Sequence, residues 1–219
     1  MSDATTSTEQ AARPPGRPPS AASHQAILRA TLELLAEKGL AAMSMDAVAQ
    51  RAGVSKATIY RRWKSKEELI EELLDTLYGL IPPVDSGDPR EDVLAAGRVV
   101  QGAAGPMFKL IPALVGEAAT NPEFAEVFRA KLVEPRRAQI RGFFERAVAN
   151  GEFRDDADLE FMTDVTFGTI TMRTQIAGDS FDGLVEDQAR IWDMLVEAYG
   201  TPKGKRALAR RRSSLGEAG

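Results

Sequence analysis

The sequence contains no cysteine and only one histidine, His24. The absence of cysteine excludes disulfide bonds, thiolate metal ligands and cysteine nucleophiles. A histidine-based catalytic triad or a multi-histidine metal site would lack its main residue, because His24 stands alone near the N-terminus. No constellation of carboxylates, lysines, tyrosines or hydroxyls typical of an active site stands out. We therefore expect no enzyme, no cofactor and no metal site.

Long apolar runs are also missing. None approaches the roughly 18 residues that cross a bilayer, and the N-terminal residues lack the hydrophobic core of a signal peptide. The sequence therefore predicts a cytoplasmic protein without membrane contact. The formal net charge of −4 does not by itself indicate a nucleic-acid partner. Basic residues are nevertheless clustered, and a local cluster suffices to bind phosphate because salt screens each charge within about 10 Å.

The basic clusters lie at Arg13 and Arg17, from Lys56 to Lys66, and from Lys203 to Arg212. Residues 1–21 are rich in Ala, Ser, Thr and Pro, a composition that cannot bury a core and predicts a disordered arm. The two arginines of this arm are interpreted either as part of an inert tail or as groups that enter a DNA minor groove. Residues 201–219 are expected to form a basic flexible tail, which is either simply solvated or attracts DNA without sequence preference.

The rest of the chain has helical periodicity and no strand-like alternation, so we expect an all-α fold of about nine helices. Residues 22–80 form the first predicted domain. The Pro- and Gly-containing stretch from Ile81 to Asp88 is the predicted boundary, and residues 88–200 form a larger second domain. Asp88-Pro89 and Asn121-Pro122 each combine an N-cap with a proline in the first turn, which predicts helix starts. Pro135 is expected to kink or split the helix in which it lies.

The segment from Ser44 to Leu69 predicts a helix-turn-helix. Ser44, Ser55 and Ser65 are placed to cap three successive helices, and Glu68 completes a capping box with Ser65. Gly53 lies at the tight turn, where glycine accepts backbone angles that other residues resist. The four-residue spacing of Ile59 and Trp63 directs both side chains inward.

This arrangement leaves a basic and aromatic surface around residue 60. The first turn of a recognition helix faces the bases, so Lys56 and Arg61 are expected to donate to guanine. The methyl groups of Ala57 and Thr58 are expected to contact thymine methyl groups. Phosphate contacts are expected of Tyr60, Arg62 and Lys66. Arg17, in the N-terminal arm, is also expected to contact DNA.

The stretch from Ile27 to Leu69 resembles the N-terminal domain of the TetR family of transcriptional regulators. The elements that carry the resemblance are LLAEKG, SMDAVAQRAGVSKATIYRRW and KSKEEL. The resemblance implies a homodimer, a three-helix DNA-binding domain, and a larger helical domain that holds an effector pocket and the dimer interface. It adds Ser44 to the expected phosphate contacts. NPEFAEVFRAKLVEPRR and FGTITMRTQIAG are similar to one subgroup of the family and support the same architecture.

Apolar residues of the second half supply candidates for an effector pocket, although aromatic residues at helical spacing are more often core. The expected ligand-binding residues are Phe108, Phe143, Phe144, Phe167, Met172 and Arg173. Polar groups on nearby turns come from Thr163, Thr166, Thr171 and Gln175. Arg173 is interpreted either as a partner for an anionic effector group or as a bridge between two subunits. A mostly apolar pocket with few polar groups suits a small lipophilic molecule.

The last two predicted helices, about 157–177 and 183–199, are the candidates for the dimer face, because two helices meeting their copies form a symmetric four-helix interface. The expected interface residues are Gly168, Thr171, Ile191, Trp192, Leu195 and Tyr199. His24 is expected on the surface. The acidic group of Asp155, Asp156, Asp158 and Glu160 suggests a helix start rather than a metal site.

The sequence therefore predicts a ligand-responsive repressor that binds a pseudo-palindromic DNA operator as a homodimer. An unknown small-molecule effector would release it from the operator. Two alternatives remain open at this point: a constitutive DNA-binding protein without an effector, and a helical enzyme with an incidental basic patch.

Overall fold

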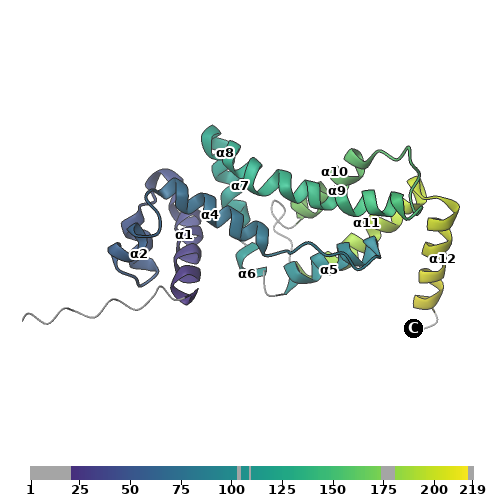
Figure 1. The fold of residues 1–219 in the computed structure, drawn as a ribbon, viewed down its shortest axis with the longest axis horizontal. Helices are drawn as coiled ribbons and strands as arrows, with labels where there is room; N and C mark the ends of the chain where they lie inside the picture. Colours follow the sequence, from purple (N-terminus) through teal and green to yellow (C-terminus); the bar gives the residue numbers. More distant parts are fainter. Residues whose placement is uncertain (1–20, 103–104, 109, 174–180, 217–219) are drawn as a thin grey trace, which may run out of the picture.

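The fold is seen in a computed structural model, which describes residues 21–102, 105–108, 110–173 and 181–216. These residues form helices, loops and one isolated β-bridge between Phe153 and Gly200. In Figure 1, α1 (Ala21–Ala42), α2 (Met45–Arg51) and α4 (Lys66–Gly79) make up one end of an elongated molecule. The short α3 (Lys56–Tyr60) completes this end. The all-α prediction is confirmed for the described residues.

Serine caps begin the helices of the first domain, as the sequence predicts. Ser44, Ser55 and Ser65 accept hydrogen bonds from the backbone N–H groups three residues later, at 3.2, 3.2 and 3.3 Å. The side chain of Glu68 accepts from the backbone N–H of Lys64 rather than from that of Ser65. Helical geometry in α1 is interrupted by a kink at Gly39, whose φ of 73° is in the left-handed region that favours glycine, and resumes up to Ala42.

The middle of the chain contains α5 (Pro89–Gln101), α6 (Gly105–Phe108), α7 (Ile111–Thr120) and α8 (Pro122–Phe128). Asp88 and Asn121 cap α5 and α8 as expected. The π-helical turn η1 (Arg129–Val133) leads from α8 into α9 (Glu134–Ala149). The chain remains helical across Pro135, and proline's missing N–H group is accommodated by the wider π-helical turn just before it, so the helix is not split there.

The last helices are α10 (Leu159–Thr171), α11 (Leu184–Tyr199) and α12 (Pro202–Gly216). Asp158 accepts a hydrogen bond from the backbone N–H of Phe161 at 3.0 Å and so caps α10, the helix-start role expected for the acidic group. No cluster of three or more potential metal ligands occurs in the ranges that the structure describes.

The expectation of a flexible tail from residue 201 is wrong through Gly216, where the chain forms α12. Leu208 is only 2% exposed and packs into the core that contains Trp192. Gly204 allows close packing, because a Cβ there would lie 2.2 Å from the carbonyl oxygen of Glu152. Figure 1 places α12 at the end of the molecule opposite α2. The basic residues of this segment therefore lie far from the helix-turn-helix.

Two hydrophobic clusters stabilise the fold. The first joins α1–α4 to α6, α7 and α8, so that Leu32 and Ile59 belong to the same cluster as Leu114 and Phe124. The second lies between α5, α9, α10, α11 and α12 and centres on Phe144, Phe153 and Trp192. The core of α1–α4 is thus continuous with the first helices after the predicted boundary. None of the described helices has the length and apolar character to cross a bilayer.

Candidate DNA interface and effector cavity

Two buried side chains and a turn glycine fix α3 against the first domain. Gly53 has a φ of 67° at the turn between α2 and α3. Ile59 is fully buried and Trp63 is 2% exposed, so the predicted anchors are confirmed. Helix α3 ends at Tyr60, and Arg61 and Arg62 follow as its C-cap and first turn residue.

The surface opposite these anchors is the one predicted to contact DNA. Ser44, Lys56, Ala57, Tyr60, Arg61 and Arg62 are exposed. Thr58 is half-buried, and its hydroxyl lies 2.9 Å from that of Ser55. The guanidinium of Arg62 lies over the ring of Trp63, 5.3 Å from its centroid. The structure thus brings the predicted base-facing residues together on one accessible surface.

Two of the predicted DNA contacts have intramolecular partners. Lys56 forms an ion pair with Asp46 in the first turn of α2, and this hydrogen bond and the negative charge raise the pKa of Lys56. Lys66 is half-buried, and its ammonium group donates to the carbonyl oxygen of Leu40 at 3.0 Å. To bind DNA, Lys56 must therefore release Asp46 or share it with the DNA. Lys66 must do the same with the carbonyl group of Leu40.

The described chain begins beside the end of α3. Ser23 and Ile27, from the first turns of α1, line a small recess together with Thr58, Arg61 and Arg62. The first described residues of α1 therefore lie beside the predicted DNA-facing surface. Arg17 itself lies outside the described residues.

The expectation that His24 is a surface residue is wrong. Its side chain is 21% exposed and stacks on Trp63, with ring centroids 5.8 Å apart. His24 Nε2 lies 3.3 Å from one carboxylate oxygen of Glu72 in α4, and Trp63 Nε1 donates to the other at 2.5 Å. Glu72 thus holds the start of α1 and the segment after α3 together around the buried ring of Trp63. A lone histidine in an exposed-looking first turn gave no sequence signal of this role.

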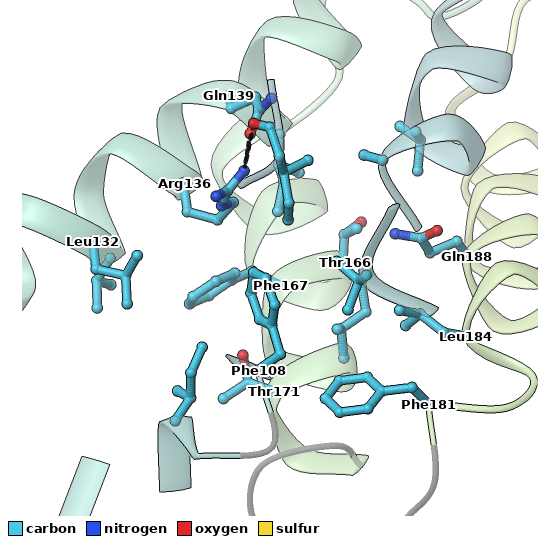
Figure 2. A pocket seen from close by; sticks show the side chains of 18 of the residues that line it. Phe108, Leu132, Arg136, Gln139, Thr166, Phe167, Thr171, Phe181, Leu184 and Gln188 are labelled. Carbon is cyan, nitrogen blue, oxygen red and sulfur yellow. Dashed lines mark hydrogen bonds between the residues drawn. The ribbon is translucent and has the colours of Figure 1, made fainter. Parts of the chain in front are cut away.

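A cavity of about 190 Å³ lies in the second domain, between helices α5 to α11 (Figure 2). Phe108, Phe143 and Phe167 line it, as predicted. Of the expected polar groups, Thr166 and Thr171 also line it, whereas the buried Thr163 does not and Gln175 lies outside the described residues. Most of the remaining lining is aliphatic or aromatic.

Three of the predicted ligand-binding residues do not line this cavity. Phe144 is buried in the second cluster, stacked on Trp192 with centroids 5.4 Å apart. Met172 is 54% exposed. Arg173 is also exposed and forms an ion pair with Asp187 on α11 of the same chain. Helical spacing does not distinguish a cavity wall from a packed core or an exposed face, which is why these assignments were wrong.

Sequence analysis missed three polar residues of the cavity wall. Arg136 and Gln139 reach it from α9, and Gln188 reaches it from α11 (Figure 2). Arg136 donates to the carbonyl oxygen of Tyr78 at 2.7 Å, and burial lowers its pKa to about 10. In the sequence EPRR, an arginine looks like part of a solvated helix face, so nothing in the pattern distinguishes Arg136 from Arg137.

Three of the expected dimer residues belong to the core of the single chain. Ile191, Trp192 and Leu195 are 8%, 1% and 2% exposed, so they offer almost no surface to a second subunit, and their assignment was wrong. Thr171 is half-buried on the cavity wall, and Tyr199 is half-buried with the guanidinium of Arg154 over its ring. Gly168 is exposed on α10.

A different set of apolar side chains is exposed on the same two helices. Phe161 and Met194 are each 53% exposed, on α10 and α11, and Met172 at the end of α10 is similar. Sequence periodicity selected the inward face of these helices, because buried positions carry the stronger apolar repeat. A phenylalanine or methionine next to a charged residue, as each of these three is in the sequence, could have indicated the outward face.

Comparisons with known proteins agree with this architecture. Residues 27–73 match the family model described as bacterial regulatory proteins, tetR family, and residues 83–190 match the tetracyclin repressor-like C-terminal domain. The HTH-type transcriptional regulator YdeS of Bacillus subtilis is 35% identical over 78% of this chain and 88% of its own.

Two further relatives were found. The DNA-binding transcriptional repressor TetR of Mycobacteroides abscessus is 33% identical over 74% of this chain and 89% of its own. A solved TetR-family regulator from a Rhodococcus species has a TM-score of 0.64 at 18% identity, and covers 80% of this chain and 98% of its own. Its low identity supports the fold alone. The helix-turn-helix, the C-terminal helical domain and the similarity to these relatives agree with one another. Together they show that this chain is a non-enzymatic DNA-binding regulator and belongs to the TetR family of transcriptional regulators.

Proposed function

We propose that this regulator is a ligand-responsive repressor that acts in the cytoplasm as a homodimer and leaves its operator when a small molecule fills the cavity. The observation that carries the proposal is the combination of an exposed basic surface on α3 with an apolar cavity in the second domain of the same chain. A constitutive DNA-binding protein would have no use for the cavity.

The surface around α3 supports base recognition. Arg61 has the donor geometry for the O6 and N7 atoms of guanine, and Ala57 exposes a methyl group for a thymine methyl. Tyr60 and Arg62 flank these residues and are placed to contact phosphates, which set the register of docking. Ser44 and Lys66 are proposed as further phosphate contacts. Arg17 is proposed to reach DNA because the described chain begins beside Arg61.

Exposed apolar side chains on α10 and α11 support the homodimer. Phe161, Met172 and Met194 are each about half exposed in a single chain, which is unusual for side chains of this size. Gly168 on α10 would allow a second copy to approach closely. In a two-fold dimer the recognition helices would enter successive major grooves about 34–36 Å apart, and the operator would be pseudo-palindromic.

An effector would act by binding the DNA-released arrangement more tightly than the DNA-bound arrangement, since a ligand shifts a conformational equilibrium only through differential affinity. Contacts that would transmit the change join the two parts of the chain. Lys131 in η1 pairs with Asp75 of α4 at 3.1 Å, and Glu117 of α7 binds the backbone of Leu40.

The proposal is tested by fluorescence anisotropy with DNA from upstream of the coding region, across a salt series. A protein that makes 6–10 phosphate contacts is expected to lose about 10³- to 10⁵-fold in affinity between roughly 50 and 200 mM salt. Random DNA of the same length is the control and should bind more weakly at every salt concentration. Equal affinity for both DNAs, or a flat salt response, would contradict the proposal.

A further inference from the structure

The cavity contains one charged side chain among its lining residues, all of which belong to the described parts of the chain. This side chain is Arg136, and its neighbours on the wall are aliphatic and aromatic residues with two threonines and two glutamines. Figure 2 shows Arg136 and Gln139 on one side of the cavity and Gln188 on the other. The apolar space between them has the size of a small organic molecule, because an apolar cavity of about 150 Å³ accepts benzene.

Every described hydrogen-bond partner of Arg136 is uncharged. Its guanidinium donates to the carbonyl oxygens of Tyr78 and Ile81, at 2.7 and 3.4 Å, and to the side-chain oxygen of Gln139. It also lies over the ring of Tyr78, 4.9 Å from the centroid. No carboxylate of the described residues pairs with it, whereas Arg137 beside it pairs with both Glu160 and Asp164.

The guanidinium of Arg136 is half-buried, and without an anion this is costly, because it has lost part of its water without gaining a counter-charge. Burial accordingly lowers the pKa of Arg136 to about 10. A ligand carboxylate that entered the cavity would supply the missing charge, and the planar guanidinium binds carboxylates through two parallel hydrogen bonds. The buried side-chain oxygen of Gln188 has no hydrogen-bond partner among the described residues, but as an acceptor it does not bind a carboxylate, so the anion is assigned to Arg136 alone.

The carbonyl groups that Arg136 now binds lie at the end of α4. Tyr78 is in the last turn of this helix, and Ile81 follows its C-cap residue, Leu80. Carbonyl groups at a helix C-terminus have no partners within the helix, so Arg136 supplies donors for them. Helix α4 begins just after the α3 segment. A ligand that competes for these donors would therefore alter how α4 is held at the end nearest the cavity.

We propose that the effector is an amphipathic organic acid, with an apolar body in the cavity and one carboxylate on Arg136, and that Arg136 links this carboxylate to the end of α4. The inference rests on the proposed effector role of the cavity. It places the anion-binding role on Arg136 instead of Arg173.

The inference is tested by calorimetric titration of the full-length protein, without DNA, with matched pairs of probes. The pairs are octanoate with octanol and phenylpropanoate with phenylpropanol, which differ in the carboxylate and share the apolar body. Each acid is expected to bind about 10- to 100-fold more tightly than its alcohol, the range for hydrogen bonds to a charged group. Arg136→Met should remove this preference, and Arg136→Lys should retain part of it.

Arg137→Met is the matched control, because it removes an adjacent guanidinium that pairs with Glu160 and Asp164 and does not line the cavity, so it should leave the preference unchanged. Thermal melting of each variant checks folding, and Arg136→Lys keeps the test valid if Arg136→Met does not fold. Equal binding of acids and alcohols, a preference that survives in Arg136→Met, or no binding of any probe at millimolar concentration would overturn the inference.

One further measurement completes the test. Octanoate should lower the affinity of the wild-type protein for its preferred DNA and should have no effect on Arg136→Met, and an equal effect on both would overturn the link to α4. Because probe binding is measured without DNA, failure of the inference is distinguishable from failure of the repressor proposal.

Discussion

The carboxylate of Glu117 accepts a hydrogen bond from the backbone N–H of Leu40, 77 positions earlier in the chain, at 2.9 Å. Leu40 lies just after Gly39, where α1 loses helical geometry, and its carbonyl oxygen accepts from Lys66 at 3.0 Å. A Cβ on Gly39 would lie 3.2 Å from the same carboxylate. Glu117 thus connects the second domain to the end of α1 beyond the Gly39 kink, which leads into the helix-turn-helix.

Glu117→Ala is expected to lower the free energy of unfolding by about 1.5–3 kcal/mol, because it removes a hydrogen bond to a charged acceptor. The amide of Leu40 should also exchange its hydrogen faster, since it loses its partner. Denaturant unfolding and hydrogen exchange measure the two effects. Glu126→Ala, at an exposed position on α8, is the control. An unchanged rate of hydrogen exchange at Leu40 would show that the bond to Glu117 does not hold this part of the chain in place.

Asp46→Asn should increase affinity for DNA several-fold. The substitution removes a negative charge near the phosphates and releases Lys56 from its ion pair. Anisotropy titrations at low salt measure the change. Asp156→Asn removes the same charge from an exposed pair with Arg154 in the second domain and serves as the control, with no expected effect on DNA binding. A loss of affinity in Asp46→Asn would mean that Asp46 positions Lys56 instead of competing for it.

The carboxylate of Asp92 has no exposed surface and joins α5 to α9. It accepts from Arg146 at 3.0 Å and from the backbone and hydroxyl of Ser86 at 2.9 and 2.6 Å. Desolvation raises the pKa of Asp92, but the hydrogen bonds from Ser86 and Arg146 outweigh this effect and leave the pKa below its ordinary value of 3.8.

This lowered pKa gives Asp92 a defined pH dependence. A carboxyl group whose pKa is lower in the folded state stabilises the protein fully above the unfolded pKa, and the contribution disappears as the pH falls through the folded pKa. Asp92→Asn should therefore lower the free energy of unfolding by about 1.5–3 kcal/mol at pH 7. This loss should become smaller as the pH falls below about 4. Denaturant unfolding across pH measures this. Asp85→Asn, which removes an exposed partner of the same arginine, should change stability by less than about 1 kcal/mol. A cost for Asp92→Asn that does not vary with pH would refute this assignment.

Leu208→Ala should destabilise the protein by about 2–5 kcal/mol, the range for truncation of a buried leucine. The reason is that α12 packs Leu208 into the core around Trp192. Thermal or denaturant unfolding measures the loss, and Lys205→Ala at an exposed position of the same helix should have little effect. If both variants were as stable as the wild type, residues 202–216 would behave as the flexible tail that composition alone suggests.

Local signals predicted the first domain well. Serine N-caps, a glycine at a turn that needs positive φ, and the spacing of Ile59 and Trp63 each act within a few residues, so the sequence carries them directly. Asp88-Pro89 and Asn121-Pro122 predicted helix starts for the same reason. The exposed surface of α3 could be predicted by elimination, because the residues that do not anchor the helix had to face outward.

Tertiary placement explains what could not be predicted. The six basic residues from Lys203 to Arg212 suggested a solvated tail, and only contacts with Trp192 and Glu152 reveal that Leu208 and Gly204 pack. Arg136 and Arg137 are neighbours in sequence, yet one reaches a cavity and the other a surface ion pair. The helical spacing of Ile191 and Leu195 fits a dimer interface and a hydrophobic core equally well. The structure assigns both residues to the core.

The central claim is that the surface of α3 reads DNA bases, and selection of bound sequences from random DNA tests it most directly. The wild-type protein is expected to enrich an inverted repeat. Arg61→Ala should lose preference at one position of each half-site, at a cost of about 1–3 kcal/mol. Arg206→Ala, which removes an exposed cation from α12 at the opposite end of the molecule, should enrich the same repeat as the wild type. No enriched sequence, or an unchanged repeat with Arg61→Ala, would contradict the claim.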